Sequence, residues 1–470
     1  MKRQKIVFLS IILILVFIFQ PFATAGATVG DTASEEIWPD GPSVSAESAI
    51  VMEASTGLIL YEKNINDAHY PASITKIMTA LLALENSSLG EVVTFSKDAV
   101  FKVDLDSSRV GIDVGEQLTM QQCLYTLILE SDNVVAYAIA EHVAGSIPAF
   151  TEMMNEKAKS LGCLNTNFTN PHGLPDENHV TSAYDMALIT REALKNETFR
   201  KIFNTRTYQI PPTNIQSETR YLGNHHRFIL KQDYYYDDCI GGKTGYTDAA
   251  KYTLVTVAKR GDLELICVLM KDDSFDHQYL NTQALLDFAF DNFSIYPTNA
   301  LEASQALQES PLFTRFNPIL SKSDSPIVTG GKGFLVLPNT ASFEDAKKQV
   351  SFYPASEIRE GGNVIGQISY TYHDKYVGGA DIIYNKVEKP TLTNAVPDIK
   401  SPTVITEDSK PSEPSGNLRP IIIGVIVGLF VIIIGFYIVL VERPRLKRKS
   451  AYYRNKANRR RHQDDDYLDL

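Results

Sequence analysis

Residues 71–79 read Pro71-Ala72-Ser73-Ile74-Thr75-Lys76-Ile77-Met78-Thr79. Apolar residues recur at helical spacing from Ser73 to Glu85, and Pro71 stands where helices commonly begin, so a helix is predicted. Residues three apart share one face of a helix, and the Ser73 and Lys76 side chains can therefore meet. A serine hydroxyl becomes a good nucleophile when a base removes its proton. Lysine, with an ordinary pKa of about 10.4, is such a base only where burial, a second cation or a helix N-terminus lowers that pKa.

The second motif is Ser131-Asp132-Asn133, which lies between two predicted helices, residues 118–129 and 134–143. At such a turn the Ser131 hydroxyl can relay a proton to a leaving amine. The Asn133 amide can bond both a substrate carbonyl and a lysine. Taken alone, this motif is more simply a polar helix cap, just as Ser73 and Lys76 alone are more simply an N-cap serine and a surface lysine.

The third motif is Lys243-Thr244-Gly245, preceded by Gly241-Gly242 and followed by a β-rich region. A strand edge here can pair with a peptide-like substrate through main-chain hydrogen bonds. Lys243 supplies the second cation and can hold a terminal carboxylate together with Thr244, while Gly245 lets the substrate approach the backbone. The simpler interpretation is a glycine-rich turn with a solvated lysine. The ordered set of three motifs is far more specific than any one of them and is typical of seryl penicillin-interacting enzymes.

The periodicities predict an α/β (α+β) domain with one antiparallel sheet flanked by helices. Strand pairs are expected at residues 49–52 with 58–61 and 252–258 with 263–270, and they enclose helices at 147–161 and 182–194 besides those named above. A helix over 275–293 closes the domain. A small all-β domain follows at 296–387, with strands such as 333–337 and 364–372, and no internal repeat is found.

The two ends of the chain predict export and anchoring. Residues 1–25 have a basic start, an apolar run and Ala23-Thr24-Ala25, as a cleaved signal peptide does, although an uncleaved signal anchor is an alternative. A flexible lead follows at 26–41. A Pro/Ser/Thr linker over 388–419 precedes a charge-free transmembrane helix at 420–441 and a basic tail at 442–470. The positive-inside rule then predicts a single-pass protein of the cell membrane with an extracellular body and a cytoplasmic tail.

Charge and cysteine content limit the partners. The net charge of −11, despite a basic tail, argues against nucleic acid, and the tail is expected to meet anionic lipid head groups. The four cysteines are too few for a disulfide scaffold and are expected to be buried free thiols; they are Cys123, Cys163, Cys239 and Cys267. No metal site or cofactor is expected, because the pair His225-His226 has no carboxylate cluster around it in sequence and favours a loop.

Beyond the three motifs, the sequence resembles the D-alanyl-D-alanine carboxypeptidases among the low-molecular-mass penicillin-binding proteins. The resemblance is close over residues 45–293 and weaker to 386. It rests on residues 71–79, on Asn165-Thr166-Asn167-Phe168-Thr169-Asn170-Pro171-His172-Gly173-Leu174-Pro175 and on Ala183-Tyr184-Asp185-Met186-Ala187. It implies a penicillin-binding D,D-peptidase domain at 42–295 with a transpeptidase/β-lactamase-like fold, and a β-sandwich domain at 296–387.

The resemblance also implies roles in the cleavage of a peptidoglycan stem peptide ending in D-Ala-D-Ala. Ser73 is the nucleophile, Lys76 the general base and Ser131 the proton relay. The substrate-binding residues are Asn133, Lys243, Thr244, Gly245 and Tyr246, with the backbone N–H groups of Ser73 and Tyr246 as the oxyanion hole. β-Lactams are then covalent inhibitors. His172 and Asp185 are interpreted as structural, a loop anchor and a helix cap.

Two departures from the best-known members are Asp132, where they often carry Gly, and Tyr246, where they carry His. Those members also anchor by an amphipathic helix rather than a full span. A β-lactamase shares the three motifs but needs a well-placed glutamate, and the loop Pro171-His172-Gly173-Leu174 offers none. A D,D-endopeptidase shares every motif and stays open. A non-hydrolytic β-lactam sensor is disfavoured because the tail holds no cytoplasmic domain.

Overall fold

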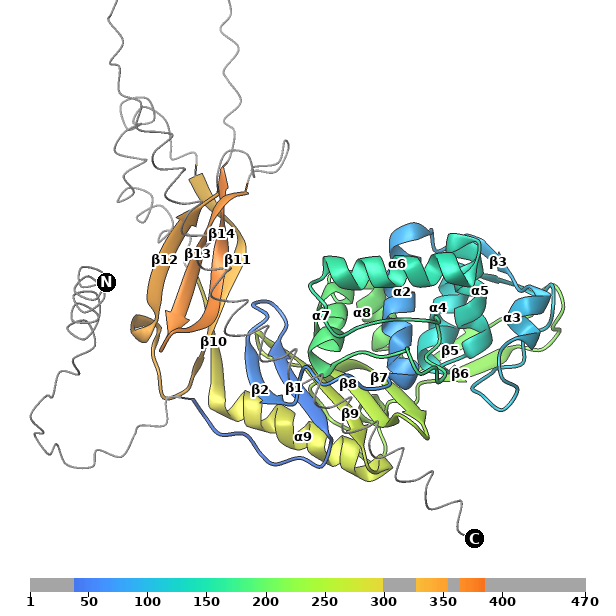
Figure 1. The fold of residues 1–470 in the computed structure, drawn as a ribbon, viewed down its shortest axis with the longest axis horizontal. Coiled ribbons are helices and arrows are strands. Elements are labelled where there is room, and N and C mark those ends of the chain that lie inside the picture. Colours follow the sequence, from blue (N-terminus) through green and yellow to red (C-terminus); the bar gives the residue numbers. More distant parts are fainter. Residues whose placement is uncertain (1–37, 299–326, 354–363, 385–470) are drawn as a thin grey trace, which may run out of the picture. The chain divides into compact units, whose positions relative to one another are not determined.

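The computed structural model describes residues 38–298, 327–353 and 364–384, which contain two five-stranded antiparallel sheets (Figure 1). The predicted signal peptide, transmembrane helix and basic tail lie outside the described residues. Within the described residues no single helix is long and apolar enough to cross a membrane, and one pair of helices, bent by 85°, passes that test by length and composition only.

The first sheet has the strand order β2-β1-β9-β8-β7, so the start and the end of the domain meet where β1 pairs with β9. This arrangement confirms both predicted strand pairs. Side chains of β9 alternate between two buried apolar clusters, for example Ile266 in one and Leu265 in the other, because both faces of the sheet are covered. The strands are β1 (Ser48–Glu53), β2 (Ile59–Lys63), β7 (Cys239–Thr247), β8 (Lys251–Arg260) and β9 (Leu263–Asp272).

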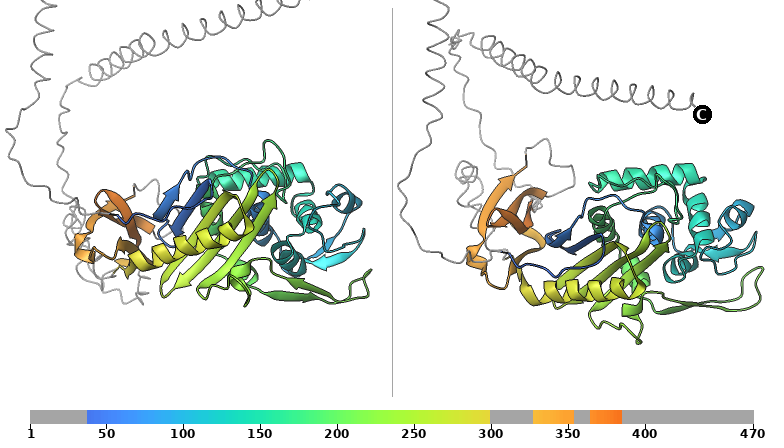
Figure 2. Two further views of the ribbon diagram at one scale, coloured as in Figure 1. Left: turned by 90° about the horizontal axis from the view of Figure 1, so that it is seen from below. Right: turned by 60° about the horizontal axis from the view of Figure 1, so that its bottom comes forward.

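Helices cover the two faces unequally (Figure 2). α9 packs on β8 and β9 from one side, and α7 packs on β1 and β9 as part of the helical layer on the other side. The α-helices are α2 (Lys76–Asn86), α3 (Lys97–Phe101), α4 (Met120–Leu129), α5 (Asn133–Ala144), α6 (Ile147–Ser160), α7 (Ala183–Ala193), α8 (Glu197–Phe203) and α9 (Phe275–Asn292). Two two-stranded antiparallel sheets lie beside the helices: β3 (Val92–Thr94) with β4 (Gln117–Thr119), and β5 (Thr207–Ile210) with β6 (Arg220–Gly223).

Two details correct the sequence-based expectations around the motifs. The helix predicted from Ser73 begins with a 3₁₀ turn, η1 (Ala72–Thr75), and α2 itself starts at Lys76. The predicted turn at Gly241-Gly242 lies inside strand β7, where a bulge follows Cys239. A Cβ atom on Gly242 would lie 2.2 Å from the His226 ring, so glycine is needed here because an imidazole packs against the strand.

The second sheet has the order β10-β11-β14-β13-β12 and confirms an all-β unit after α9. Its strands are β10 (Phe293–Pro297), β11 (Ile327–Pro338), β12 (Lys347–Phe352), β13 (Val364–Tyr372) and β14 (Lys375–Tyr384). β10 starts at Phe293, directly after α9 and three residues before the predicted boundary at 296. The described residues of this unit form one sheet, and the β-sandwich stays a prediction.

All four cysteines are free thiols, as predicted, but the expectation that all of them are buried is wrong for Cys163 and Cys239, which are partly exposed. Cys123 and Cys267 are buried in apolar surroundings. The pair His225-His226 lies in the segment between β6 and the 3₁₀ turn η2 (Arg227–Ile229), which agrees with the expected loop.

Candidate active site

The structure brings the first two motifs into direct contact through the amino group of Lys76. Lys76 Nζ lies 2.9 Å from Ser73 Oγ, 2.6 Å from Asn133 Oδ1 and 2.7 Å from the carbonyl oxygen of His172. Lys76 is completely buried at the start of α2. Three segments that are distant in sequence, those around residues 76, 133 and 172, therefore meet at one nitrogen atom.

The surroundings of this amine shift its acid–base equilibrium towards the neutral form. Burial, and after it the charge of Lys243, hold the pKa of Lys76 well below its ordinary value against the opposing effect of Asp132. A neutral amine has two N–H donors and one lone pair. The Asn133 and His172 oxygens accept the two N–H groups, which leaves the lone pair for the hydroxyl proton of Ser73. With a neutral Lys76, each of the three contacts of Nζ is therefore a complete hydrogen bond, and the lone pair faces the Ser73 hydroxyl as a base would.

Ser131 lines the same cavity as Ser73. Ser131 has a left-handed backbone (φ 59°), which is strained for a residue with a side chain, and its buried Oγ has no hydrogen-bond partner in the described residues. Asp132 fixes this turn, because its carboxylate accepts hydrogen bonds from Val135 N–H (2.8 Å) and Val110 N–H (2.5 Å). Asp132 is therefore the N-cap of α5 and has a structural role here.

The third motif reaches the nucleophile through Gly245. A Cβ atom on Gly245 would lie 2.9 Å from the Ser73 backbone nitrogen and 2.4 Å from Thr253 Oγ1, so only glycine lets β7 come this close. The Ser73 N–H belongs to the first turn of a helix, where N–H groups lack intrahelical acceptors. β7 is an edge strand of the described sheet, and its residues Thr244, Gly245 and Tyr246 line the cavity.

Lys243 is buried in β7 rather than solvated, which rules out the simpler interpretation of this motif. Its Nζ donates to the Thr244 carbonyl oxygen at 2.8 Å. Burial lowers the pKa of Lys243 to about 7. A carboxylate placed beside it would stabilise its charged form.

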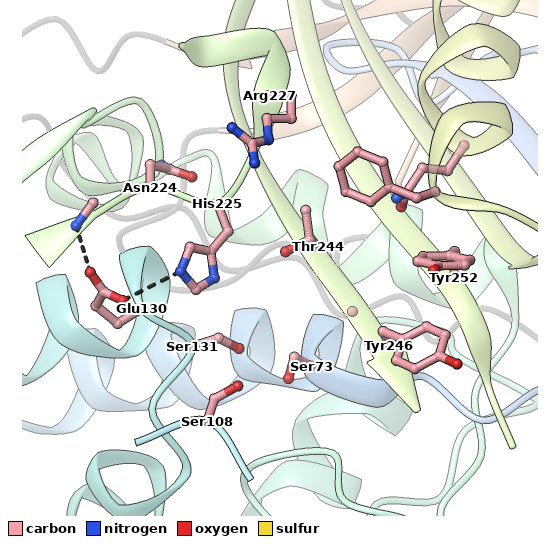
Figure 3. A pocket seen from close by; sticks show the side chains of 14 residues that line it. Ser73, Ser108, Glu130, Ser131, Asn224, His225, Arg227, Thr244, Tyr246 and Tyr252 are labelled. Carbon is pink, nitrogen blue, oxygen red and sulfur yellow. Dashed lines mark hydrogen bonds and ion pairs between the residues drawn. The ribbon is translucent and has the colours of Figure 1, made fainter. Parts of the chain in front are cut away.

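A cavity of about 570 Å³ opens above the motifs (Figure 3). Of the predicted residues, Ser73, Ser131, Thr244, Gly245 and Tyr246 line it. The side chains of Lys76, Asn133 and Lys243 lie buried behind this lining. Sequence reasoning missed further lining residues, which come from loops and from the ends of short elements: Ser108, Glu130, Asn224, His225 and Arg227. Of these residues, only Glu130 could have been predicted from the sequence to lie near the site, because it directly precedes Ser131.

The segment 165–175 is bound to the nucleophile helix. Thr79 Oγ1 donates to the Pro171 carbonyl at 2.6 Å, and Thr75 Oγ1 lies 2.9 Å from His179 Nε2. Burial, and then the charges of Lys76 and His179, lower the pKa of His172 to about 3, so its imidazole is neutral near pH 7. His172 Nδ1 accepts from Leu174 N–H at 3.2 Å, in agreement with the interpretation of His172 as a loop anchor.

Asp185 has a structural role, but a different one from the predicted helix cap. Ser182 is the N-cap of α7 and accepts from the Asp185 N–H at 3.1 Å. The buried Asp185 carboxylate instead accepts from Asn165 N–H and Thr166 Oγ1, both at 2.7 Å, and from Leu164 N–H at 3.2 Å. The Asp185 carboxylate therefore holds the start of the 165–175 segment. The sequence pattern indicated a local helix cap, but the carboxylate contacts a distant segment instead.

Replacing Asp185 by Ala should therefore destabilise the protein by about 3 kcal/mol, since a buried carboxylate that holds two N–H groups and a hydroxyl is lost. Urea unfolding followed by fluorescence measures this change. The matched control, Glu156→Ala, removes an exposed carboxylate from α6 and should change the unfolding free energy by less than about 0.5 kcal/mol. Equal stability of both variants would contradict the assignment.

Comparison with known proteins identifies the family of this chain. A profile of the D-alanyl-D-alanine carboxypeptidase family matches residues 34–274. The chain is 35% identical over 300 residues to D-alanyl-D-alanine carboxypeptidase DacF of Bacillus subtilis (strain 168), which covers 63% of this chain and 73% of that protein. It is 34% identical over 237 residues to D-alanyl-D-alanine carboxypeptidase DacB2 of Mycobacterium tuberculosis (strain ATCC 25618 / H37Rv), with 49% and 76% covered.

Solved structures show the same fold. Penicillin binding protein 5 from Haemophilus influenzae superposes with a TM-score of 0.57 at 25% identity, covering 74% of this chain and 98% of that one. The Streptomyces K15 DD-transpeptidase superposes with a TM-score of 0.51 at 29% identity, covering 54% and 100%. The predicted transpeptidase-like fold is thereby confirmed, and the chain belongs to the D-alanyl-D-alanine carboxypeptidase family.

Proposed function

We propose that this protein is a serine-type D-alanyl-D-alanine carboxypeptidase, which removes the terminal D-alanine from peptidoglycan stem peptides through an acyl-enzyme. The observation that carries the proposal is the contact of Ser73 Oγ with a completely buried Lys76 amine at 2.9 Å, in a cavity that Ser73 and Thr244 line and behind which Lys243 is buried. A hydroxyl, a base and a carboxylate-binding group converge there, as the reaction requires.

In the acylation step, Lys76 takes the hydroxyl proton while Ser73 Oγ attacks the carbonyl carbon of the penultimate D-alanine. The backbone N–H groups of Ser73 and Tyr246 stabilise the oxyanion. Asn133 Oδ1 accepts from Lys76, which leaves its Nδ2–H₂ group for the substrate carbonyl. The proton then passes from Lys76 through Ser131 Oγ to the leaving nitrogen, the C–N bond breaks, and D-alanine departs with a neutral amine.

Deacylation reverses these roles. Lys76 accepts a proton from a water molecule, the resulting hydroxide attacks the ester carbonyl, and the proton returns to Ser73 Oγ as the ester bond breaks.

The only carboxylate among the described residues that line the cavity is Glu130, and it is bonded to Gly223 N–H and His225. This supports a carboxypeptidase over a β-lactamase, which needs a glutamate free to activate water. β-Lactams are proposed to acylate Ser73 and to persist there.

The substrate carboxylate is proposed to bind between Lys243, Thr244 and Arg227. Arg227 lines the cavity on the side of Thr244 (Figure 3), and a guanidinium stays charged at every accessible pH. Lys243, by contrast, has a pKa of about 7 and loses its charge as the pH rises.

The value of kcat/KM for a carboxylate-ended peptide should therefore fall as the pH rises through about 7, because the free enzyme loses the Lys243 cation. The fall should be partial, since Arg227 keeps its charge. Bound carboxylate raises the pKa of Lys243, so the corresponding fall of kcat should occur at higher pH. Initial rates from pH 5 to 10 test this, and coincident profiles of kcat and kcat/KM would contradict it.

The proposal as a whole is tested by incubating the full-length protein in detergent with a pentapeptide ending in D-Ala-D-Ala. Mass spectrometry should show the loss of one alanine, and a fluorescent penicillin should label the protein stably. Rapid release of hydrolysed penicillin would instead indicate a β-lactamase, and an unchanged pentapeptide would refute the carboxypeptidase.

We also infer that the body lies outside the cell membrane and is held by one span at residues 420–441. The support is the charge-free stretch from Ile421 to Val441 and the basic residues that follow it. Protease treatment of intact cells should digest the body and spare a tag placed after Leu470.

A further inference from the structure

One wall of the active-site cavity is a bridge between the helical layer and the segment that follows β6. Glu130 is the C-cap residue of α4, and its carboxylate reaches across the cavity edge. Oε1 accepts from the Gly223 N–H at 2.6 Å, and Oε2 lies 3.3 Å from His225 Nε2. Burial alone would raise the pKa of Glu130, but the bonds to His225 and Gly223 outweigh it and lower that pKa. The bridge therefore contains an ionised carboxylate near pH 7.

The other side of residues 223–226 is bound elsewhere. Asn224 Nδ2 donates to the Thr205 carbonyl at 2.9 Å, and His226 Nε2 lies 2.9 Å from Thr256 Oγ1 in β8. The contacts thus alternate along the chain: the side chains of Asn224 and His226 are held by neighbouring backbone and sheet, whereas the Gly223 N–H and the His225 ring contact Glu130. Without the Glu130 carboxylate, residues 223–226 lose two contacts to α4, one at the Gly223 N–H and one at the His225 ring.

The bridge lies on the leaving-group side of the nucleophile. Figure 3 shows Tyr246 on one side of Ser73, and Ser131, Glu130 and His225 on the other. In the proposed reaction Tyr246 belongs to the oxyanion hole and Ser131 gives the proton to the departing amine. The nitrogen of the departing residue must therefore lie on the side of Ser131, which is also the side of the Glu130 bridge.

We propose that the bridge from Glu130 to Gly223 and His225 is the end wall of the leaving-group pocket, and that it favours departure of one terminal D-alanine over departure of a longer, cross-linked peptide. This inference rests on the proposed function. A D-alanine adds only a methyl group and a carboxylate beyond the scissile nitrogen. The amine of a cross-link continues into a second peptide, which has to pass where the bridge closes the cavity.

The experiment compares two substrates that share the acyl part, a pentapeptide and a cross-linked dimer, in the full-length protein. Glu130→Ala should raise the ratio of kcat/KM for the dimer to kcat/KM for the pentapeptide by about tenfold, the size of a steric discrimination. Glu130→Gln should raise it less, because the amide oxygen still accepts from the Gly223 N–H. Glu218→Ala, in an exposed residue that does not line the cavity, is the matched control.

Titration of active sites with fluorescent penicillin corrects each rate for inactive protein, so that poor folding of a variant lowers both rates equally and leaves the ratio informative. A ratio within twofold of wild type for Glu130→Ala overturns the proposal. If wild-type protein cleaves neither substrate, the proposed function itself fails. If it cleaves both and the ratio is insensitive to Glu130, only the role of the bridge fails.

Discussion

Replacing Ser73 by Ala should abolish D-alanine release, with a loss of about 10⁶-fold in kcat, the size found when a catalytic serine is removed. Among the hydroxyls that line the cavity, Ser73 Oγ is the one bonded to the Lys76 amine. Without it no acyl-enzyme forms, so the fluorescent penicillin label should disappear as well. Mass spectrometry of the peptide and of the intact protein measures both effects.

The variant should fold normally, because the only hydrogen bond that the Ser73 hydroxyl makes in the described structure is the one to Lys76, while the neighbouring Ala72 and Ile74 remain buried. Ser160→Ala, at an exposed position on α6, is the matched control and should keep wild-type activity. The competing nucleophile is Ser131, whose buried hydroxyl has no partner in the described residues. Penicillin found on Ser131, or activity that survives in Ser73→Ala, would contradict the assignment.

The placement of each of the three motifs on its own element could be predicted from sequence, because it depends on local geometry. Ser73 and Lys76 are three residues apart at a helix start, and they meet even though the first turn is 3₁₀. The Ser131 turn lies between two largely buried helices, α4 and α5, which the sequence predicts. Lys243 follows glycines that precede an unmistakable pair of β-strands. Local patterns thus place the motifs on their elements, and the resemblance to a known family supplies their order in space.

The remainder of the site depends on contacts between distant segments. Glu130 and His225 are 95 residues apart, and no periodicity links them. The third partner of Lys76 is the backbone carbonyl of His172, which any residue type could supply. Gly242 suggested a turn, because a sequence does not distinguish a glycine that bends the chain from one that makes room for a ring such as His226. Asp185 suggested a helix cap, because a sequence does not distinguish a carboxylate that caps its own helix from one that binds a distant segment.

The second large effect is expected at Lys76. Lys76→Ala removes the general base and should lower the acylation rate by about 10²- to 10⁴-fold. Lys76→Arg separates two explanations of that loss, because a guanidinium keeps the positive charge but does not become a neutral base in a protein. If Lys76 acts by taking the Ser73 proton, both variants should be similarly slow. Stopped-flow penicillin acylation gives these rates directly.

Lys159→Arg is the matched control, since Lys159 is exposed at the end of α6 and should tolerate the change. The completely buried position of Lys76 leaves little space for the longer side chain, so circular dichroism and unfolding in urea must accompany the rates. A folded Lys76→Arg protein that acylates within tenfold of wild type would mean that position 76 contributes charge rather than basicity. The lowered pKa of Lys76, caused by burial and by Lys243, would then serve no catalytic purpose, and the proton of Ser73 would have to leave by another route.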